Sequence, residues 1–258
     1  MDAALRTQLK TLWLDTHTRA QKGQGVAQEF LDTQKAGYAC ENLCRDAVYG
    51  MGDAMQDTYD TDNSGAGKAL KAALGNIKTG QGDAATKGDT AKTDTATWVA
   101  DAATLRSQYA AVLATVAPGP VADALAQSMT LLDSSTQVGK STSLNSSEAY
   151  GRFGTALSRA SGFADEVGAD LSPAKGGKNV RAAARTAVSY VGEMKSLLSG
   201  VSSDVGKAGL NVNQAAQLCW QAADPLDRLL FPHRDGEAAE SLPDWLDLTK
   251  VASAPRTE

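Results

Sequence analysis

The chain has 258 residues and a formal net charge of −5, with 42% hydrophobic and 21% charged residues, which is typical of a folded protein with a buried core. Its 25 lysines and arginines are scattered, and without a basic cluster nucleic acid is not expected to be the main partner. No stretch approaches the roughly 20 uninterrupted apolar residues of a membrane-spanning helix. Residues 1–19 lack the basic start, apolar core and cleavage site of a secretory signal, while export without a cleaved signal stays open.

Apolar residues recur in steps of three and four along most of the chain. One such stripe runs through Trp98, Ala102, Leu105 and Tyr109, and these steps place its members on one side of an α-helix. No alternating strand pattern competes with it. Aromatic residues are scarce and small residues abundant, so the helices are expected to pack closely. The sequence therefore predicts an all-α protein, an elongated multi-helix bundle of about seven or eight helices.

Turn-forming residues divide the first half of this pattern. Gly23 and Gly25 interrupt or bend the first helix, and residues 80–92, rich in Gly, Asp, Thr and Ala, are interpreted as a mobile linker and possible hinge. Further on, Pro118-Gly119-Pro120 forces a turn between two helices.

The second half is divided in the same way. Residues 134–144 are interpreted as a polar loop, after which Asn145 and Glu148 have the spacing of a helix N-cap. The helical bundle is expected to cover residues 1–231, and the prolines that follow predict an extended C-terminal tail over 232–258. In chain order the expected helices cover residues 3–21, 26–58, 70–77, 93–116, 121–132, 145–167, 179–207 and 213–230.

Two segments carry partial matches to ligand-binding loops. Residues 137–142 match the end of a phosphate-binding loop, but Ser134 stands where the first glycine should be and no strand precedes it. Residues 60–65 match the opening of a calcium-binding loop, whose twelfth position should be a glutamate but is Lys71. A solvated loop and a helix-ending turn are the preferred interpretations.

Cysteine and histidine, which often hold metals or act in catalysis, are few, whereas carboxylates are plentiful but form only ordinary pairs. Cys40, Cys44 and Cys219 fall on apolar stripes and are expected to be buried, reduced thiols. His17 and His233 are interpreted as surface residues, which leaves few ways to build a zinc site or a catalytic triad. No catalytic residue, metal or cofactor is predicted.

Residues 109–122 form the most apolar window of the chain and contain no charge. We interpret it as two core helices that meet around a tight turn. The alternative is an apolar hairpin that leaves the bundle and enters a membrane, as in α-helical pore-forming toxins.

The tail carries large apolar residues beside acidic ones, in a segment too short to form its own core. Such a segment is typical of a docking peptide that binds a groove on a partner. The alternative is a tail that packs on its own bundle. The predicted partner-binding residues are Leu242, Trp245, Leu246 and Leu248.

The long helices with small-residue faces, together with the missing catalytic constellation, favour a non-enzymatic structural or interaction protein. A component of a virion or of a bacterial secretion or injection apparatus would have these properties, through self-association or a protein partner. A secreted effector or helical pore former is one alternative. The other is an enzyme or ligand-binding bundle whose polar groups meet only in the fold.

Overall fold

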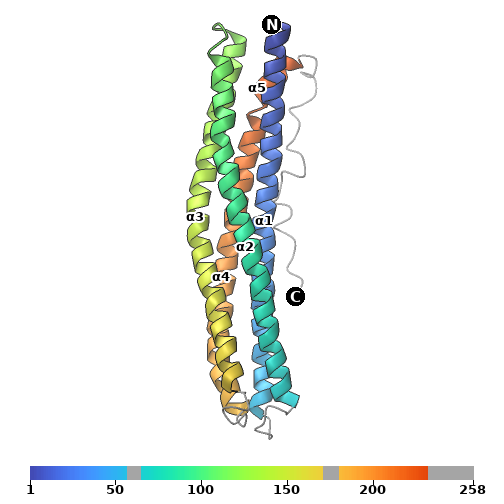
Figure 1. Cartoon of the computed structure of the whole chain (residues 1–258), viewed down its shortest axis with the longest axis vertical. Helices are drawn as coiled ribbons and strands as arrows, with labels where there is room; N and C mark the ends of the chain where they lie inside the picture. Colours follow the sequence, from blue (N-terminus) through green and yellow to red (C-terminus); the bar gives the residue numbers. More distant parts are fainter. Residues whose placement is uncertain (57–64, 171–179, 232–258) are drawn as a thin grey trace. The chain divides into compact units, whose positions relative to one another are not determined.

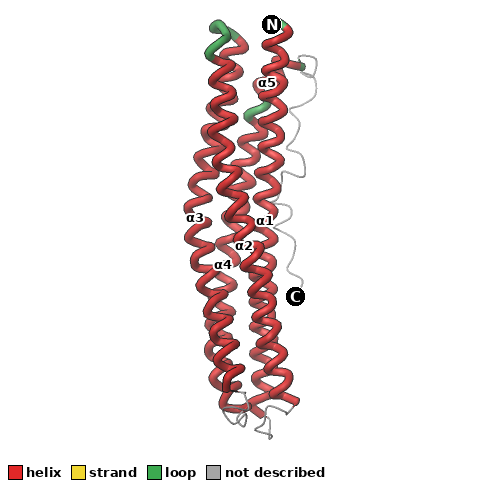
Figure 2. The backbone as a smooth tube through the Cα atoms, in the orientation of Figure 1, coloured by secondary structure: helices red, strands yellow, loops and turns green. Residues whose placement is uncertain are grey.

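The computed structural model describes residues 1–56, 65–170 and 180–231 (Figure 1). This part of the chain contains no strand, so the prediction of an all-α protein is confirmed (Figure 2). The prediction of seven or eight helices is wrong, because several predicted helices are parts of one. The described residues form four long helices and one short one: α1 (Ala3–Gln56), α2 (Gly65–Leu113), α3 (Pro120–Asp170), α4 (Val180–Gln221) and α5 (Asp224–Leu230).

The interruptions expected from the sequence lie inside the long helices. Gly23 and Gly25 belong to α1, residues 80–92 to α2 and residues 134–144 to α3. The linker and the polar loop predicted there are therefore helical. Glycine in a helix interior costs up to about 1 kcal/mol relative to alanine, and packing against neighbouring helices offsets that local cost.

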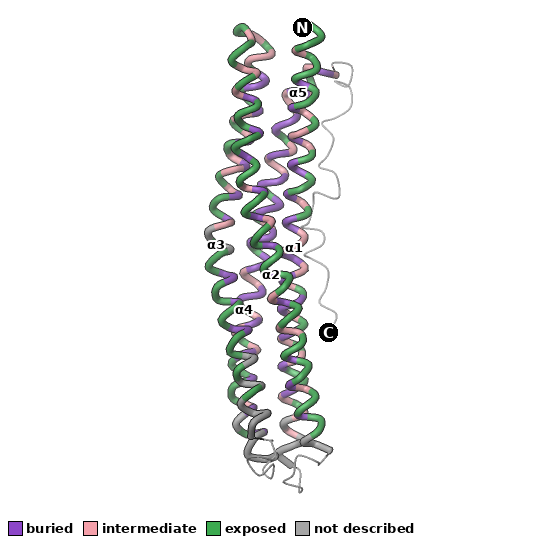
Figure 3. Tube along the Cα trace, viewed as in Figure 1, coloured by how far each residue is buried: buried purple, intermediate pink, exposed green. Residues whose placement is uncertain are grey.

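The buried positions of the long helices follow a seven-residue repeat, with buried and exposed residues on opposite sides (Figure 3). Their steps alternate between three and four, which is the spacing of the a and d positions of a heptad. Small and polar residues share this seam with aliphatic ones. In α1 it comprises Leu9, Leu12, Thr16, Arg19, Gly23, Val26, Phe30, Thr33, Gly37, Cys40, Cys44 and Ala47.

The chain divides into two compact units, each built from parts of all four long helices. Unit 1 comprises Met1–Leu31, Ala91–Ser146 and Lys207–Glu258, and unit 2 comprises Asp32–Thr90 and Ser147–Gly206. A hinge within residues 80–92 stays a prediction, as does a single domain over 1–231. The predicted tail over 232–258 lies outside the described residues.

The core of unit 2 combines aliphatic, aromatic and small side chains. Cys40 and Cys44 of α1 are fully buried there, in one cluster with Ile77 of α2 and Phe153 of α3. Gly37 of α1 faces this cluster, and a Cβ at that position would collide with Oγ of Ser202 and lie 3.0 Å from Cε2 of Phe153. The absent side chain therefore leaves room for the hydroxyl of Ser202 and the ring of Phe153.

A short turn joins α2 to α3 in unit 1 (Figure 2). Gly119 adopts a φ of +150°, a conformation that residues with a side chain rarely adopt, and Pro120 begins α3. The window 109–122 thus holds the end of α2, this turn and the start of α3, as predicted. Of the helices in the described ranges, none has the length and apolar character needed to cross a membrane.

Candidate functional site

The segments with partial loop motifs have a different role in the fold. Residues 137–142 lie within α3, so they lack the strand and loop of a phosphate-binding site and are not the solvated loop that was predicted. Lys140 is exposed, whereas Gly139 is buried. Outside the described residues lie positions 60–64 of the calcium-like segment, His233, and the predicted partner-binding residues Leu242, Trp245, Leu246 and Leu248.

All three cysteines are buried and free, as predicted. A hydrogen bond with Cys40 and burial both raise the pKa of the Cys44 thiol, and burial raises the pKa of Cys219 to about 12. Cys44 and Cys219 therefore stay neutral at pH 7 and pack as small apolar groups. Within the described ranges, no three His, Cys, Asp or Glu side chains converge on a metal site.

Arg19 occupies a core position of α1 in unit 1 and is 5% exposed. Its Nη1 donates a hydrogen bond to the carbonyl oxygen of Trp98 in α2, and its guanidinium lies over the Trp98 ring, 4.3 Å from the ring centre. In return, the indole Nε1 of Trp98 donates to the carbonyl oxygen of Arg19 at 2.9 Å. Two hydrogen bonds and a cation–π contact thus join α1 to α2 at this level.

The surroundings of Arg19 satisfy its charge only in part. Burial lowers the pKa of Arg19, while the Cys219 thiol and the Asp101 carboxylate act in the opposite direction. An arginine side chain loses its proton only far above neutral pH, so the guanidinium keeps its charge. Its Nη2 is buried and has no hydrogen-bond partner among the described residues. The core of unit 1 therefore holds a cation with hydrogen-bonding capacity left over.

The ring of Trp98 fits between two glycines on other helices. A Cβ at Gly23 of α1 would lie 2.6 Å from Cζ2 of the ring, and a Cβ at Gly139 of α3 would lie 3.1 Å from Cζ3. Ala216 of α4 closes the same site, at 3.0 Å from the Cβ position of Gly23. The bundle accommodates its large Trp98 because the facing positions carry almost no side chain.

A second polar contact lies at Thr16, the core position of α1 that precedes Arg19. The hydroxyls of Thr16 and Tyr109 are 2.8 Å apart, and Thr16 Oγ1 lies 2.7 Å from the carbonyl oxygen of Leu12, to which it donates. A hydroxyl has one proton to donate, so Tyr109 is the donor in the pair. Burial raises the pKa of Tyr109 to about 12, which keeps it protonated as this role requires.

A hollow of about 240 Å³ opens between α1 and α2 beside Arg19. Its walls carry cations, carboxylates, hydroxyls and an apolar surface. It can therefore contact the opposite charges of a small zwitterionic molecule together with an apolar group. The lining residues are Asp15, Thr18, Arg19, Lys22, Trp98, Asp101, Thr104, Leu105 and Gln108.

His17 is half-buried in an aromatic cluster, which corrects its interpretation as a surface residue. Its ring centre lies 4.1 Å from that of Trp220 in α4 and 4.6 Å from that of Trp13. Trp13 in turn contacts Phe231, with ring centres 5.7 Å apart. This cluster anchors the end of α5 against α1.

Sequence reasoning missed Arg19, because a charged residue on an amphipathic helix is normally solvated. The signal that could have found it is its spacing, three residues after Thr16 and four before Gly23 in the buried seam. Comparison of the chain with protein-family models, with curated proteins and with solved structures finds no match. Function is therefore inferred from the geometry of the chain itself.

Proposed function

We propose that the protein is a non-enzymatic helical interaction protein that works as a component of a larger protein assembly, such as a virion or a bacterial secretion or injection apparatus. The observation that supports this best is the outward surface of α2. Every seventh residue on this surface is small and exposed. We call this set the α2 outer face: Ala72, Thr79 and Thr86 in unit 2, and Thr93, Ala100 and Ser107 in unit 1.

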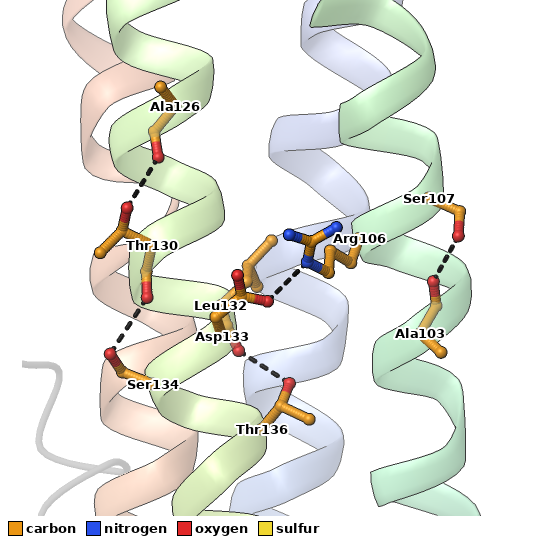
Figure 4. A network of polar contacts seen from close by, with 9 residues as sticks. All are labelled: Ala103, Arg106, Ser107, Ala126, Thr130, Leu132, Asp133, Ser134 and Thr136. Atoms are coloured by element: carbon orange, nitrogen blue, oxygen red, sulfur yellow. Dashed lines mark hydrogen bonds and ion pairs between the residues drawn. The ribbon is translucent and has the colours of Figure 1, made fainter.

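Three hydroxyls of the α2 outer face, those of Thr79, Thr86 and Ser107, donate within their own helix. Thr79 donates to the carbonyl oxygen of Gly75 at 3.1 Å, and Thr86 to that of Gly82 at 2.9 Å. Ser107 donates to the carbonyl oxygen of Ala103 at 2.8 Å (Figure 4). A partner helix that covers this face would therefore leave these three hydroxyls with their hydrogen-bond partners, and an unpaired hydroxyl is the usual cost of burying one.

Side-chain size favours association on the same face. Helix axes approach to a distance set by the side chains between them, so Ala, Ser and Thr permit a close approach. Small side chains also lose little conformational entropy when they are covered, whereas lysine or glutamate would lose up to about 2 kcal/mol. The α2 outer face is thus suited to repeated contact with another helix, from a second copy or from a partner.

The solution mass of the purified protein tests this proposal. We expect a defined oligomer in the absence of lipid, and Thr86→Arg is expected to shift the mass toward the monomer by placing a long charged side chain in the contact. Thr130→Arg is the matched control, because Thr130 is an exposed threonine of α3 whose hydroxyl also donates to its own helix, at 3.0 Å to Ala126 (Figure 4).

Three outcomes would contradict the proposal. A monomer at every concentration, or equal effects of the two arginine variants, would remove the α2 outer face as the contact. Leakage of lipid vesicles on addition of the protein would support a helical pore former instead.

A second candidate function, a ligand-binding bundle, is favoured by the hollow beside Arg19. Arg19 and Lys22 could receive an anionic group and Asp101 a cationic one, so a free amino acid is a suitable probe. A ligand that binds only the folded state raises its Tm with concentration. We expect such a rise to be lost in Asp101→Asn and kept in Asp83→Asn, an exposed carboxylate elsewhere on α2. No rise with any amino acid would exclude this function.

A further inference from the structure

In a heptad bundle the b position of each helix points away from the core. The parts of α2 and α3 in unit 1 follow this rule. Of their b positions, Ala110 is half-buried and the others are exposed: Ala96, Ala103, Ala126, Asp133 and Lys140.

Most of the corresponding positions of α1 and α4 in unit 1 are covered, although Lys10 near the start of α1 is exposed. Leu31 of α1 is 3% exposed and Asn213 of α4 is 2% exposed. His17 and Gln24 of α1 and Trp220 of α4 hold other b positions and are half-buried. We call these five residues the α1–α4 outer row. The contact between the rings of His17 and Trp220 covers part of both, whereas Leu31 and Asn213 are almost fully buried at positions that this rule would leave exposed.

The α1–α4 outer row forms a continuous strip. α1 and α4 are neighbours, since the rings of His17 and Trp220 lie 4.1 Å apart and a Cβ at Gly209 would lie 2.8 Å from the Cβ of Phe30. The b positions recur every seven residues, or about 10.5 Å along each helix. By this register Gln24 is level with Asn213, and the strip continues to Leu31.

Two polar atoms at this surface indicate what chemistry would cover it. The side-chain oxygen Oδ1 of Asn213 and the indole Nε1 of Trp13 are buried and have no hydrogen-bond partner among the described residues. Burying such atoms unpaired is costly, and a covering peptide offers both the N–H donors and the C=O acceptors that they lack. Apolar side chains on the same peptide would cover Leu31.

We propose that residues 232–258 of the same chain dock along the α1–α4 outer row and place their apolar residues around Trp245 against Leu31. This inference is independent of the assembly proposed above. The segment starts at the strip, because Phe231 packs on Trp13 with ring centres 5.7 Å apart and Arg6 Nη2 donates to the carbonyl oxygen of Leu230 at 3.3 Å.

The segment is long enough to reach the far end of the strip. Leu31 lies 18 residues beyond Trp13 on α1, which is about 27 Å along a helix. Phe231 and Leu242 are 11 residues apart, and an extended chain of that length spans up to about 36 Å. Leu242 and every later residue can therefore lie over Leu31.

Thermal melting of the full chain tests the docking through a double-mutant cycle. Leu31→Ala and Trp245→Ala are each expected to lower Tm by about 4–8 °C, as for loss of a large apolar contact in a chain of this size. The double variant should lose clearly less than the sum, because both changes remove the same contact. Leu14→Ala is the control: Leu14 is a leucine of α1 that is 57% exposed, so its small effect should add to that of Trp245→Ala.

The solution mass distinguishes docking within one chain from docking between chains. We expect Trp245→Ala to leave the mass unchanged, and the Tm loss to be independent of protein concentration. Additive Tm losses in the double variant, or no loss in Trp245→Ala, would overturn the docking. A lower mass in Trp245→Ala would assign the α1–α4 outer row to a second copy and equally overturn it, whereas the assembly proposal depends on Thr86→Arg.

Discussion

The backbone of Gly23 lies so close to the indole ring of Trp98 that a methyl group at position 23 would meet Cζ2 at 2.6 Å. Gly25, two residues further along α1, is exposed, and its Cβ would meet no other helix or side chain within 4 Å. Two glycines of one helix therefore respond to the same substitution in opposite directions.

Gly23→Ala is expected to lower the free energy of unfolding by about 1–3 kcal/mol, because the Trp98 ring must shift in a packed core. Gly25→Ala is expected to raise it by about 0.5–1 kcal/mol, because alanine favours the helix. Urea denaturation of both variants measures the difference. A stabilising Gly23→Ala would show that the Trp98 ring does not require the empty position.

Variants at Gly139 and Lys140 distinguish a packing role of residues 137–142 from a phosphate-binding role. Gly139→Ala should lower Tm, because its Cβ would meet Cζ3 of Trp98 at 3.1 Å, whereas Lys140→Ala should leave Tm unchanged because Lys140 is exposed. ATP titration monitored by calorimetry should give no heat of binding in the wild type. Binding that Lys140→Ala abolishes would contradict the helical assignment of this segment.

Alkaline pH should destabilise the fold through two buried groups. The pKa values of Tyr109 and Cys219 are raised to about 12 in the folded chain, from ordinary values of 10.0 and 9.0. The unfolded chain therefore loses these protons first as pH rises. Their contribution to stability is complete below pH 9 and is lost progressively up to about pH 12.

Tyr109→Phe isolates one of these two groups. The variant should lose about 1 kcal/mol at neutral pH, because the hydrogen bond to Thr16 is absent. Its stability should then decline less steeply than that of the wild type above pH 10, as followed by urea denaturation at a series of pH values. Parallel curves for the two proteins would show that Tyr109 is not the group responsible.

The buried charge of Arg19 should matter less than its volume. Arg19→Met keeps a long side chain and removes an incompletely satisfied cation, so its free energy of unfolding is expected to stay within about 1 kcal/mol of the wild type. Arg19→Ala removes packing against Trp98 and should cost about 2 kcal/mol or more. Denaturant titrations of the two variants compare them. Equal losses would assign the stabilising role to the charge itself.

The fold class could be predicted because the spacing of residues such as Val191, Met194 and Leu198 depends only on the local helical period. The number of helices could not. Ser135 resembles a turn former in isolation, and only its hydrogen bond to the carbonyl oxygen of Ala215, at 2.6 Å, shows that it belongs to the core. Its partner lies 80 residues away, so no sequence window contains the pair.

The candidate site was hidden for the same reason. Arg19 is joined to Trp98 across 79 residues, and neither residue type signals by itself that the two side chains stack. The charge of Arg19 predicted that its side chain is exposed to solvent. The guanidinium lies in the core instead, because tertiary contacts of this kind outweigh local preference.

The ring of Trp98 in α2 fills the space that side chains at Gly23 of α1 and Gly139 of α3 would occupy. A smaller residue at position 98 would free space at both Gly23 and Gly139, and a side chain at either glycine would require a smaller residue at position 98. The three positions are therefore expected to vary together in homologous chains, although they are far apart in the sequence. In a single molecule the same dependence means that Trp98→Leu should cost less stability in the Gly23→Ala variant than in the wild type, so the two losses are not independent.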